Sequence, residues 1–328
     1  MASVLERKLL VVTGKGGVGK TTVAAALGLL AAERGLRAIV VEVGDQARLP
    51  ELFGRTAHDA GVETKLEENL WSITIDPDRA LLEWLQTLGG RVSGRVLASS
   101  STFQYFTAAA PGARELVSMV KIWELTQGER WRRRAGGYDL VVLDGPATGH
   151  ALGMLHSPQT FGAIARVGPI AGQTQRVREL LENPARSGYV GVAQGTEMAV
   201  TETLELTDGL QRRIGRELEL VIVNGVLPQR FTGAELERIS QLNGHAGGPL
   251  KHGASTSEKR REVGSDEAVV RSAALAARAV HDRARFQHNQ VARLRRRHFE
   301  VVGVPFMFTA ALDLPAVRRI AEHLGRTL

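Results

Sequence analysis

A glycine-rich segment near the start of the chain has the residue types and spacing of a phosphate-binding loop. The pattern G-x-x-x-x-G-K-[ST] is matched by Gly14-Lys15-Gly16-Gly17-Val18-Gly19-Lys20-Thr21. In such a loop the backbone N–H groups and the positive end of the following helix dipole surround one point, where a phosphate binds. We expect Lys20 to reach the β- and γ-phosphates and the Thr21 hydroxyl to ligate Mg²⁺. Thr22 follows in the first helical turn, close enough to contact the α-phosphate.

An acidic residue at the end of a second strand completes the expected phosphate and metal site. Residues 138–144 read YDLVVLD, an apolar run that ends at Asp144. Ligands of parallel sheets bind at the carboxyl ends of the strands, which is also where the glycine loop begins. We therefore expect Asp144 to hold Mg²⁺ through a water molecule. The small residues of the next segment, 145–150, can change conformation and are suited to sensing the γ-phosphate.

Apolar strand-like runs recur along the chain, with helical patterns between most of them. They are Leu9–Val12, Ala38–Val43, Trp71–Ile75, Leu140–Leu143, Tyr189–Ala193, Leu220–Val223 and Val301–Val304. The first run leads into the glycine loop, and an alanine- and leucine-rich helical pattern follows the loop from Thr22 to Glu33. The alternation predicts an α/β fold, a P-loop NTPase with a mostly parallel, doubly wound sheet. A single domain over residues 1–328 is long enough to bury such a core.

Two intervals are too long to be simple crossovers between strands. Residues 77–136 and 153–186 contain helical patterns and hardly any strand signal, which predicts a helical subdomain inserted into the core. The apolar stripes in these segments fit either internal packing or a groove for an apolar partner. Residues 243–266 are rich in Gly, Ser, His and charge, and they predict a mobile loop. A long helix is expected at 267–298, and a closing helix after an N-cap at Asp313.

Composition limits the classes of site and partner. The chain has no cysteine, which excludes disulfides, thiolate metal sites and a cysteine-zinc bridge between subunits. Its formal charge is +7, with part of the surplus between Ser255 and Glu300. A basic patch alone carries no specificity, so nucleic acid is not the expected partner. The longest alanine- and leucine-rich stretch, 23–32, is too short to span a bilayer. Together with the polar first residues, this favours a cytoplasmic protein.

The motifs together resemble those of the arsenite-pump ATPases and of the related ATPases that target tail-anchored membrane proteins. The loop with its second lysine looks like the deviant loop of that family, and residues 144–152 (DGPATGHAL) are similar to its second switch. Further matches, in family order, are Pro111–Glu115, Glu202-Thr203, Val223–Pro228 and Val304–Phe306. The resemblance implies ATP and Mg²⁺ as cofactors, with the adenine beside Asn224, Pro305 and Phe306.

The same resemblance implies a dimer with two ATP molecules at its interface, either a homodimer or a paralogous heterodimer. Lys15 would be the signature lysine that reaches the partner's phosphates, so that hydrolysis depends on closure of the dimer. From the loop alone, a solvated Lys15 stays an alternative. The resemblance also implies a client protein, such as a membrane protein, which the helical subdomain would hold.

The first switch departs from the family pattern. In the family it reads D-P-A-H-N-L, and its first Asp orients the attacking water. Here residues 44–49 are GDQARL, so Gly44 stands at the position of that Asp and Asp45 lies one residue later. Asp45 is the candidate water-positioning residue if the turn is rearranged, and an exposed turn residue otherwise. Because positioning and electrostatics dominate phosphoryl transfer, we expect slow or partner-dependent turnover.

Three functions are carried forward from the sequence. The leading hypothesis is a dimeric, Mg²⁺-dependent ATPase that couples its nucleotide state to a client, with the catalytic residues Lys15, Lys20, Asp45 and Asp144. Arsenite is not an expected direct ligand, because the chain lacks the thiolates that would bind it. A first alternative is a weakly hydrolysing regulatory subunit of a heterodimer, which the altered first switch suggests. A second is a DNA-associated partitioning ATPase, which would need Arg293 and residues 295–297.

Overall fold

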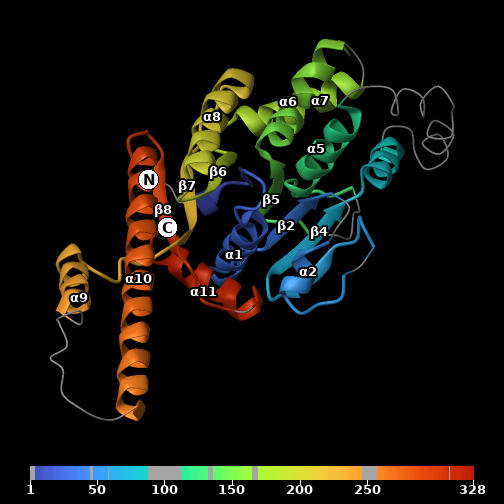
Figure 1. Cartoon of the computed structure of the whole chain (residues 1–328). Coiled ribbons are helices and arrows are strands. Elements are labelled where there is room, and N and C mark those ends of the chain that lie inside the picture. Colours follow the sequence, from blue (N-terminus) through green and yellow to red (C-terminus); the bar gives the residue numbers. More distant parts are fainter. Residues whose placement is uncertain are drawn as a thin grey trace.

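The described part of the chain is built around an eight-stranded sheet with the order β3-β4-β2-β5-β1-β6-β7-β8 (Figure 1). The computed structural model describes residues 4–44, 47–57, 59–87, 112–131, 136–164, 169–245, 257–309 and 311–328. The strands are β1 (Leu9–Gly14), β2 (Ala38–Val43), β3 (Thr64–Glu67), β4 (Leu70–Ile75), β5 (Leu140–Ala147), β6 (Ser187–Gln194), β7 (Leu220–Val226) and β8 (Glu300–Pro305). Neighbouring strands pair in parallel, except that β3 and β4 are antiparallel.

Each strand that the sequence predicts is present, and the mostly parallel sheet is confirmed. The sequence analysis missed β3, a strand of four residues at the edge of the sheet. Thr64 and Leu66 are buried while Lys65 between them is exposed. This period of two is the signal of a half-buried strand. Four residues are too few for the signal to stand out from chance.

Two hydrophobic cores lie on opposite faces of the sheet because successive side chains of a strand point in opposite directions. In β1, Leu9 and Val11 belong to one core, whereas Leu10 and Val12 belong to the other. The first core is completed by residues of α5 (Ala113–Leu125), α6 (Thr148–Ile164), α7 (Pro169–Glu182) and α8 (Glu197–Ile214). The second is completed by α1 (Lys20–Glu33), α2 (Leu49–Leu52) and α11 (Leu314–Gly325). This two-sided cover is the expected doubly wound arrangement (Figure 1).

Helices are present in both intervals where the sequence predicts an inserted helical subdomain. The apolar stripe of α5 is buried: Leu116, Met119 and Val120 lie in the first core, and Trp123 packs against it. For α5, internal packing therefore accounts for the stripe without an apolar partner. Residues 88–111 and 132–135 lie outside the described residues, and the description of these helices as one subdomain stays a prediction.

The expectation of an irregular segment over residues 243–266 is wrong at both ends of that segment. Helix α9 (Gly233–His245) runs to His245, and α10 (Ser257–Leu294) begins at Ser257; residues 246–256 lie outside the described part. Residues 258–262 read EKRRE, which are good helix formers. An apolar periodicity appears only where a helix has a buried face, so its absence was misleading. Helix α10 extends past the sheet on the β8 side (Figure 1). Among the described helices, this long one included, none combines the length and apolar composition of a membrane span.

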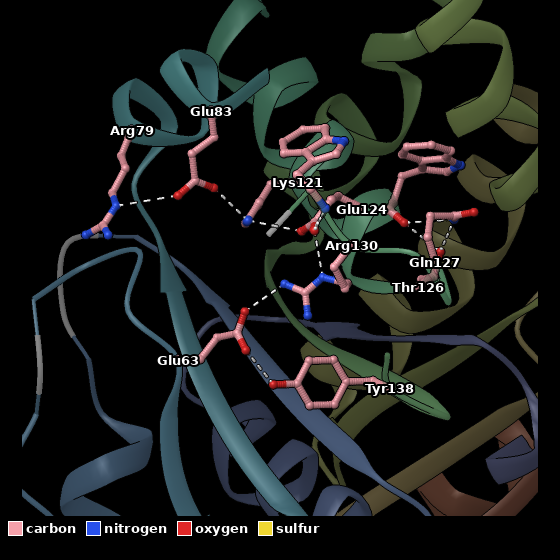
Figure 2. A network of polar contacts seen from close by, with 11 residues as sticks. Glu63, Arg79, Glu83, Lys121, Glu124, Thr126, Gln127, Arg130 and Tyr138 are labelled. Atoms are coloured by element: carbon pink, nitrogen blue, oxygen red, sulfur yellow. Dashed lines mark hydrogen bonds and ion pairs between the residues drawn. The ribbon is translucent and has the colours of Figure 1, made fainter. Parts of the chain in front are cut away.

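A buried network of charges ties α5 to the β3 edge of the sheet, as Figure 2 shows. The fully buried side chain of Arg130 donates from Nε to Glu124 Oε1 at 2.6 Å and from Nη2 to Glu63 Oε1 at 2.7 Å. The Tyr138 hydroxyl donates to Glu63 Oε2 at 2.7 Å. Each of the two carboxylates thus faces the same guanidinium, and this pairing offsets the cost of removing the charges from water.

The network continues from α5 into the helical residues 77–87 (Figure 2). Lys121 Nζ lies 3.0 Å from Glu124 Oε2 and 2.8 Å from Glu83 Oε2. Glu83 Oε1 in turn lies 3.7 Å from Arg79 Nε. Acidic and basic groups alternate along this chain of contacts, so the segment 77–87, α5 and the sheet edge are held in one arrangement.

Glu63→Gln is expected to lower the free energy of unfolding at pH 7 by about 1–3 kcal/mol, since it removes the charge that faces Arg130. Burial alone would raise the pKa of Glu63, but the hydrogen bond from Tyr138 and the charge of Arg130 outweigh it, so that this pKa is lowered. A lowered carboxyl pKa stabilises the fold above the ordinary pKa, and that contribution is lost as pH falls through the lowered value. Denaturant unfolding at decreasing pH should show the variant and the native protein converging. A difference that stays constant with pH would contradict this.

Candidate nucleotide-binding site

The glycine loop connects β1 to α1 at the carboxyl edge of the sheet. A Cβ atom at Gly14 would collide with the carbonyl oxygen of Val192 on β6, so only glycine fits at this position. Gly17 and Gly19 have φ angles of 81° and 95°, a left-handed conformation that residues with a side chain rarely adopt. Gly19 is the N-cap of α1 and makes no side-chain bond to the first turn. The first N–H groups of α1 are therefore left for an anion.

A cavity of about 910 Å³ opens over this loop. Its walls include Gly17, Gly19, Lys20, Thr21 and Thr22. Lys20 Nζ donates to the carbonyl oxygen of Lys15 at 3.0 Å, which holds the ammonium group across the loop. Burial lowers the pKa of Lys20, and the charge of Asp144 acts in the opposite direction. Predicted phosphate ligands from the loop and from the first turn of α1 thus share one cavity.

Thr21 and Asp144 are brought together because β1 pairs with β5. The Thr21 hydroxyl donates to Asp144 Oδ2 at 2.6 Å. The other carboxylate oxygen, Oδ1, is buried and has no hydrogen-bond partner among the described residues. Burial raises the pKa of Asp144 to about 6, although the hydrogen bond from Thr21 opposes this. A buried carboxylate oxygen without a partner, beside a hydroxyl, fits Mg²⁺, which takes oxygen ligands from one or two carboxylates and from substrate phosphates.

A second cavity of about 440 Å³ adjoins the first, and Thr22 and Leu312 line both. The predicted base-binding residues Asn224, Pro305 and Phe306 lie in its wall. Asn224 Nδ2 donates to the carbonyl oxygen of Val18 in the glycine loop at 2.9 Å. With the amide nitrogen bonded to the loop, the amide oxygen is the atom that can accept from an exocyclic amino group such as that of adenine. The first cavity, at the glycine loop, is therefore suited to the phosphates, and the adjoining second cavity is suited to the base.

Sequence comparison with known proteins decides the family. Residues 7–167 match the family of anion-transporting ATPases. The ATPase BagA of Mycobacterium tuberculosis is 30% identical over 245 residues, which cover 71% of this chain and 69% of that protein. The chain belongs to the anion-transporting ATPase family. The resemblance stated from the motifs is thereby confirmed, and the protein is an ATPase that uses a nucleoside triphosphate.

Two further relatives of this ATPase show how broad the family is. The arsenical pump-driving ATPase of Escherichia coli is 24% identical over 246 residues, 66% of this chain and 39% of that protein. The ATPase ASNA1 homolog 1 of Paramecium tetraurelia is 30% identical over 155 residues, 46% of this chain and 44% of that protein. The functions in these two names are those of the relatives. For this ATPase, the roles of individual residues are argued from its own geometry.

Lys15 of this ATPase forms an ion pair within its own chain. Its Nζ contacts Glu202 Oε1 on α8, and the two side chains are 30% and 33% exposed. Glu202 belongs to the Glu-Thr pair that resembles a family motif. The carboxylate partner argues against a merely solvated Lys15. A role for Lys15 at the phosphates of a second subunit stays a prediction.

The first switch is held in place by a carboxylate that the sequence did not single out for this role. Glu42, at 5% exposure, accepts from the backbone N–H of Arg48 at 2.9 Å and of Leu49 at 3.3 Å. Burial raises the pKa of Glu42, and these two backbone hydrogen bonds oppose the rise. Glu42 is thus engaged as an anchor for the loop. Asp45 lies outside the described residues, so its predicted role in positioning water stays a prediction.

The base cavity also contains two residues of α10, Arg283 and Gln287, which sequence reasoning missed. Gln287 Oε1 accepts from the backbone N–H of Leu227 at 2.8 Å, and Nε2 donates to the carbonyl oxygen of Gly225 at 3.3 Å. The sequence favoured a solvated face for α10. The predicted helix to residue 298 ends at Leu294, and the arginines 295–297, which follow it directly, are exposed. The available signal was the helical spacing of the buried residues Ala284, Val291 and Leu294.

Proposed function

We propose that this ATPase depends on Mg²⁺, acts as a dimer and couples its nucleotide state to a client protein. The observation that carries the proposal is the 2.6 Å hydrogen bond between Thr21 and Asp144, which joins the glycine loop to the second switch. Helix α6 begins at Thr148, within that switch, and packs against α5 and α7. A change at the metal or the terminal phosphate would therefore be transmitted to the helices that we expect to hold the client.

The client class is supported by the chemistry of the chain and by the names of its relatives. Because the chain has no cysteine, capture of arsenite by thiolates is not available to it. The relative from Escherichia coli is named for driving a pump. Because a pump lies in a membrane, a membrane protein is the proposed client here. Isolating the full chain in its ATP-bound form, with Asp144→Asn to slow hydrolysis, would show whether a membrane protein accompanies it.

A regulatory subunit with weak hydrolysis is the second candidate, and Gly44 at the position of the family's first-switch Asp favours it. Turnover of the purified chain, with Mg²⁺ and with a chelator, separates the two functions. Sedimentation with and without a non-hydrolysable ATP analogue measures the expected dimer. A chain that stays monomeric in every nucleotide state would contradict the dimer. Turnover that appears only after a paralogue is added would favour the regulatory subunit.

Lys15→Ala is expected to leave nucleotide binding nearly unchanged and to lower turnover by about 10²-fold or more, since a cation supplied across an interface stabilises charge in the transition state. Lys8→Ala is the matched control, because Lys8 is exposed at the opposite end of β1. Turnover and ATP affinity are measured for both variants.

Mixing two inactive variants tests whether Lys15 acts across the interface. In a mixed dimer of Lys15→Ala and Asp144→Asn, one site combines an intact Asp144 with the partner's intact Lys15. Random pairing of subunits in a two-fold dimer should then restore about a quarter of the native turnover. If Lys15 serves its own site, both sites of the mixed dimer lack an essential group and no activity returns.

A further inference from the structure

Arg48 is a cationic residue in the wall of the phosphate cavity that the family motifs do not account for. It lines the cavity of about 910 Å³ together with Gly17, Lys20 and Thr21. Its side chain is exposed, and it is the N-cap residue of the short helix α2. A guanidinium group presents up to five N–H donors in a rigid fork that matches phosphate oxygens. The cavity wall therefore contains a side chain suited to phosphate oxygens beyond those of the glycine loop.

The backbone of Arg48 is anchored to the interior of the sheet. Glu42, the next to last residue of β2, accepts from its N–H at 2.9 Å. The same carboxylate lies 3.3 Å from the backbone nitrogen of Leu49 and 3.4 Å from the Thr74 hydroxyl on β4. Because these partners belong to buried parts of the fold, residue 48 is positioned relative to the carboxyl edge of the sheet without help from a ligand.

Arg48 shares its cavity with the expected metal site. Thr21, whose hydroxyl donates to Asp144 Oδ2 at 2.6 Å, lines the same cavity as Arg48. The guanidinium thus belongs to the cavity in which the terminal phosphate is expected. Glu51 of α2 places a carboxylate in the same wall. The positive charge of Arg48 matters in this setting because ATP, with its γ-phosphate, carries more negative charge than ADP.

We propose that Arg48 binds the γ-phosphate of ATP from within the same chain and stabilises its charge during hydrolysis. The inference rests on the proposed ATP site. In the reaction the water oxygen forms a bond to the γ-phosphorus while the bond from that phosphorus to the β,γ-bridging oxygen breaks. The electron pair of that bond stays on ADP, and the proton of the water leaves with the phosphate product. Arg48 donates hydrogen bonds to γ-phosphate oxygens and acts in the first switch, where Gly44 leaves no carboxylate.

Arg48→Ala should weaken ATP binding about tenfold or more relative to ADP binding, and it should lower turnover about 10²-fold or more, as is typical when an arginine at a transferring phosphate is lost. Arg48→Lys keeps the charge but lacks the fork of donors, so an intermediate loss is expected. Arg55→Ala is the matched control, because the Nε of Arg55 donates to the carbonyl oxygen of Leu66 on β3. Calorimetric titration with ATP and with ADP, together with steady-state turnover, measures these differences.

The outcomes separate this inference from the proposed function. If Arg48→Ala keeps the native ratio of ATP to ADP affinity and the native turnover while Lys20→Ala loses turnover, the inference is overturned and the ATP site stands. If the native chain binds neither nucleotide, the proposed site itself fails. Unchanged ADP affinity verifies that each variant is folded. Arg48→Gln keeps a polar side chain at the loop and replaces the alanine variant if that one does not fold. It is expected to show the same loss of ATP affinity and turnover. Native ATP binding and turnover in Arg48→Gln would overturn the inference.

Discussion

Lys20→Ala is expected to abolish ATP turnover, with a loss of at least about 10²–10³-fold. Lys20 is the first residue of α1, and its Nζ donates a hydrogen bond of 3.0 Å across the glycine loop to the carbonyl oxygen of Lys15. In that position it neutralises the charge that moves toward the β,γ-bridging oxygen as the terminal phosphate leaves. The other lysine of the loop, Lys15, is paired with Glu202 on α8 and is therefore not expected to replace this charge.

The measurement is steady-state hydrolysis of ATP by the purified full chain, accompanied by nucleotide binding. Lys65→Ala is the matched control, because Lys65 is exposed on the edge strand β3. Both variants should unfold at the same denaturant concentration as the native chain, within a small difference. Native turnover in Lys20→Ala would show that the glycine loop is not where ATP is hydrolysed, and the proposed function would have to be abandoned.

Arg130→Met is expected to lower the free energy of unfolding by about 3–5 kcal/mol, the usual result when one member of a buried ion pair is removed. The guanidinium of Arg130 is fully buried between Glu63 and Glu124 (Figure 2), and the side chain of Glu124 is 1% exposed. Without the arginine, Glu124 retains the ion pair with Lys121, whereas Glu63 loses its paired cation and retains the hydrogen bond from the Tyr138 hydroxyl. The cost therefore comes from stranded charge more than from the lost contact area.

Denaturant unfolding of the native chain and of three variants tests this account. Arg178→Ala removes an exposed pair with Glu182 on α7 and should change the free energy of unfolding by no more than about 0.5 kcal/mol. Adding Glu63→Gln to Arg130→Met removes the carboxylate that is left without a paired cation and should recover part of the lost stability. A loss at Arg130 as small as that at Arg178, or a double variant less stable than Arg130→Met, would show that charge burial does not govern this network.

Much of the fold was accessible from the sequence because its signals are local. The apolar runs of the parallel strands are long and buried on both faces, so they appear without knowledge of the partners. The Asp313 N-cap was also predicted, and its side chain accepts from Ala316 N at 3.1 Å. The start of helix α10 was placed too late because that part of the sequence shows no apolar periodicity. Strand β3 was missed because it is defined mainly by its pairing with β4.

By itself the sequence determined that the chain binds a phosphate, since the glycine loop is a local motif whose geometry depends on its own residues. It also placed Asp144 in a strand beside the loop, but the expectation that the strand ends at Asp144 is wrong, because β5 continues to Ala147 by pairing with β1. Only the tertiary structure decided which distant groups join the loop. The pairing of β1 with β5 brings Thr21 to Asp144, and the Glu42 carboxylate holds Arg48 at the cavity. These contacts depend on strand order and register, which no local pattern encodes.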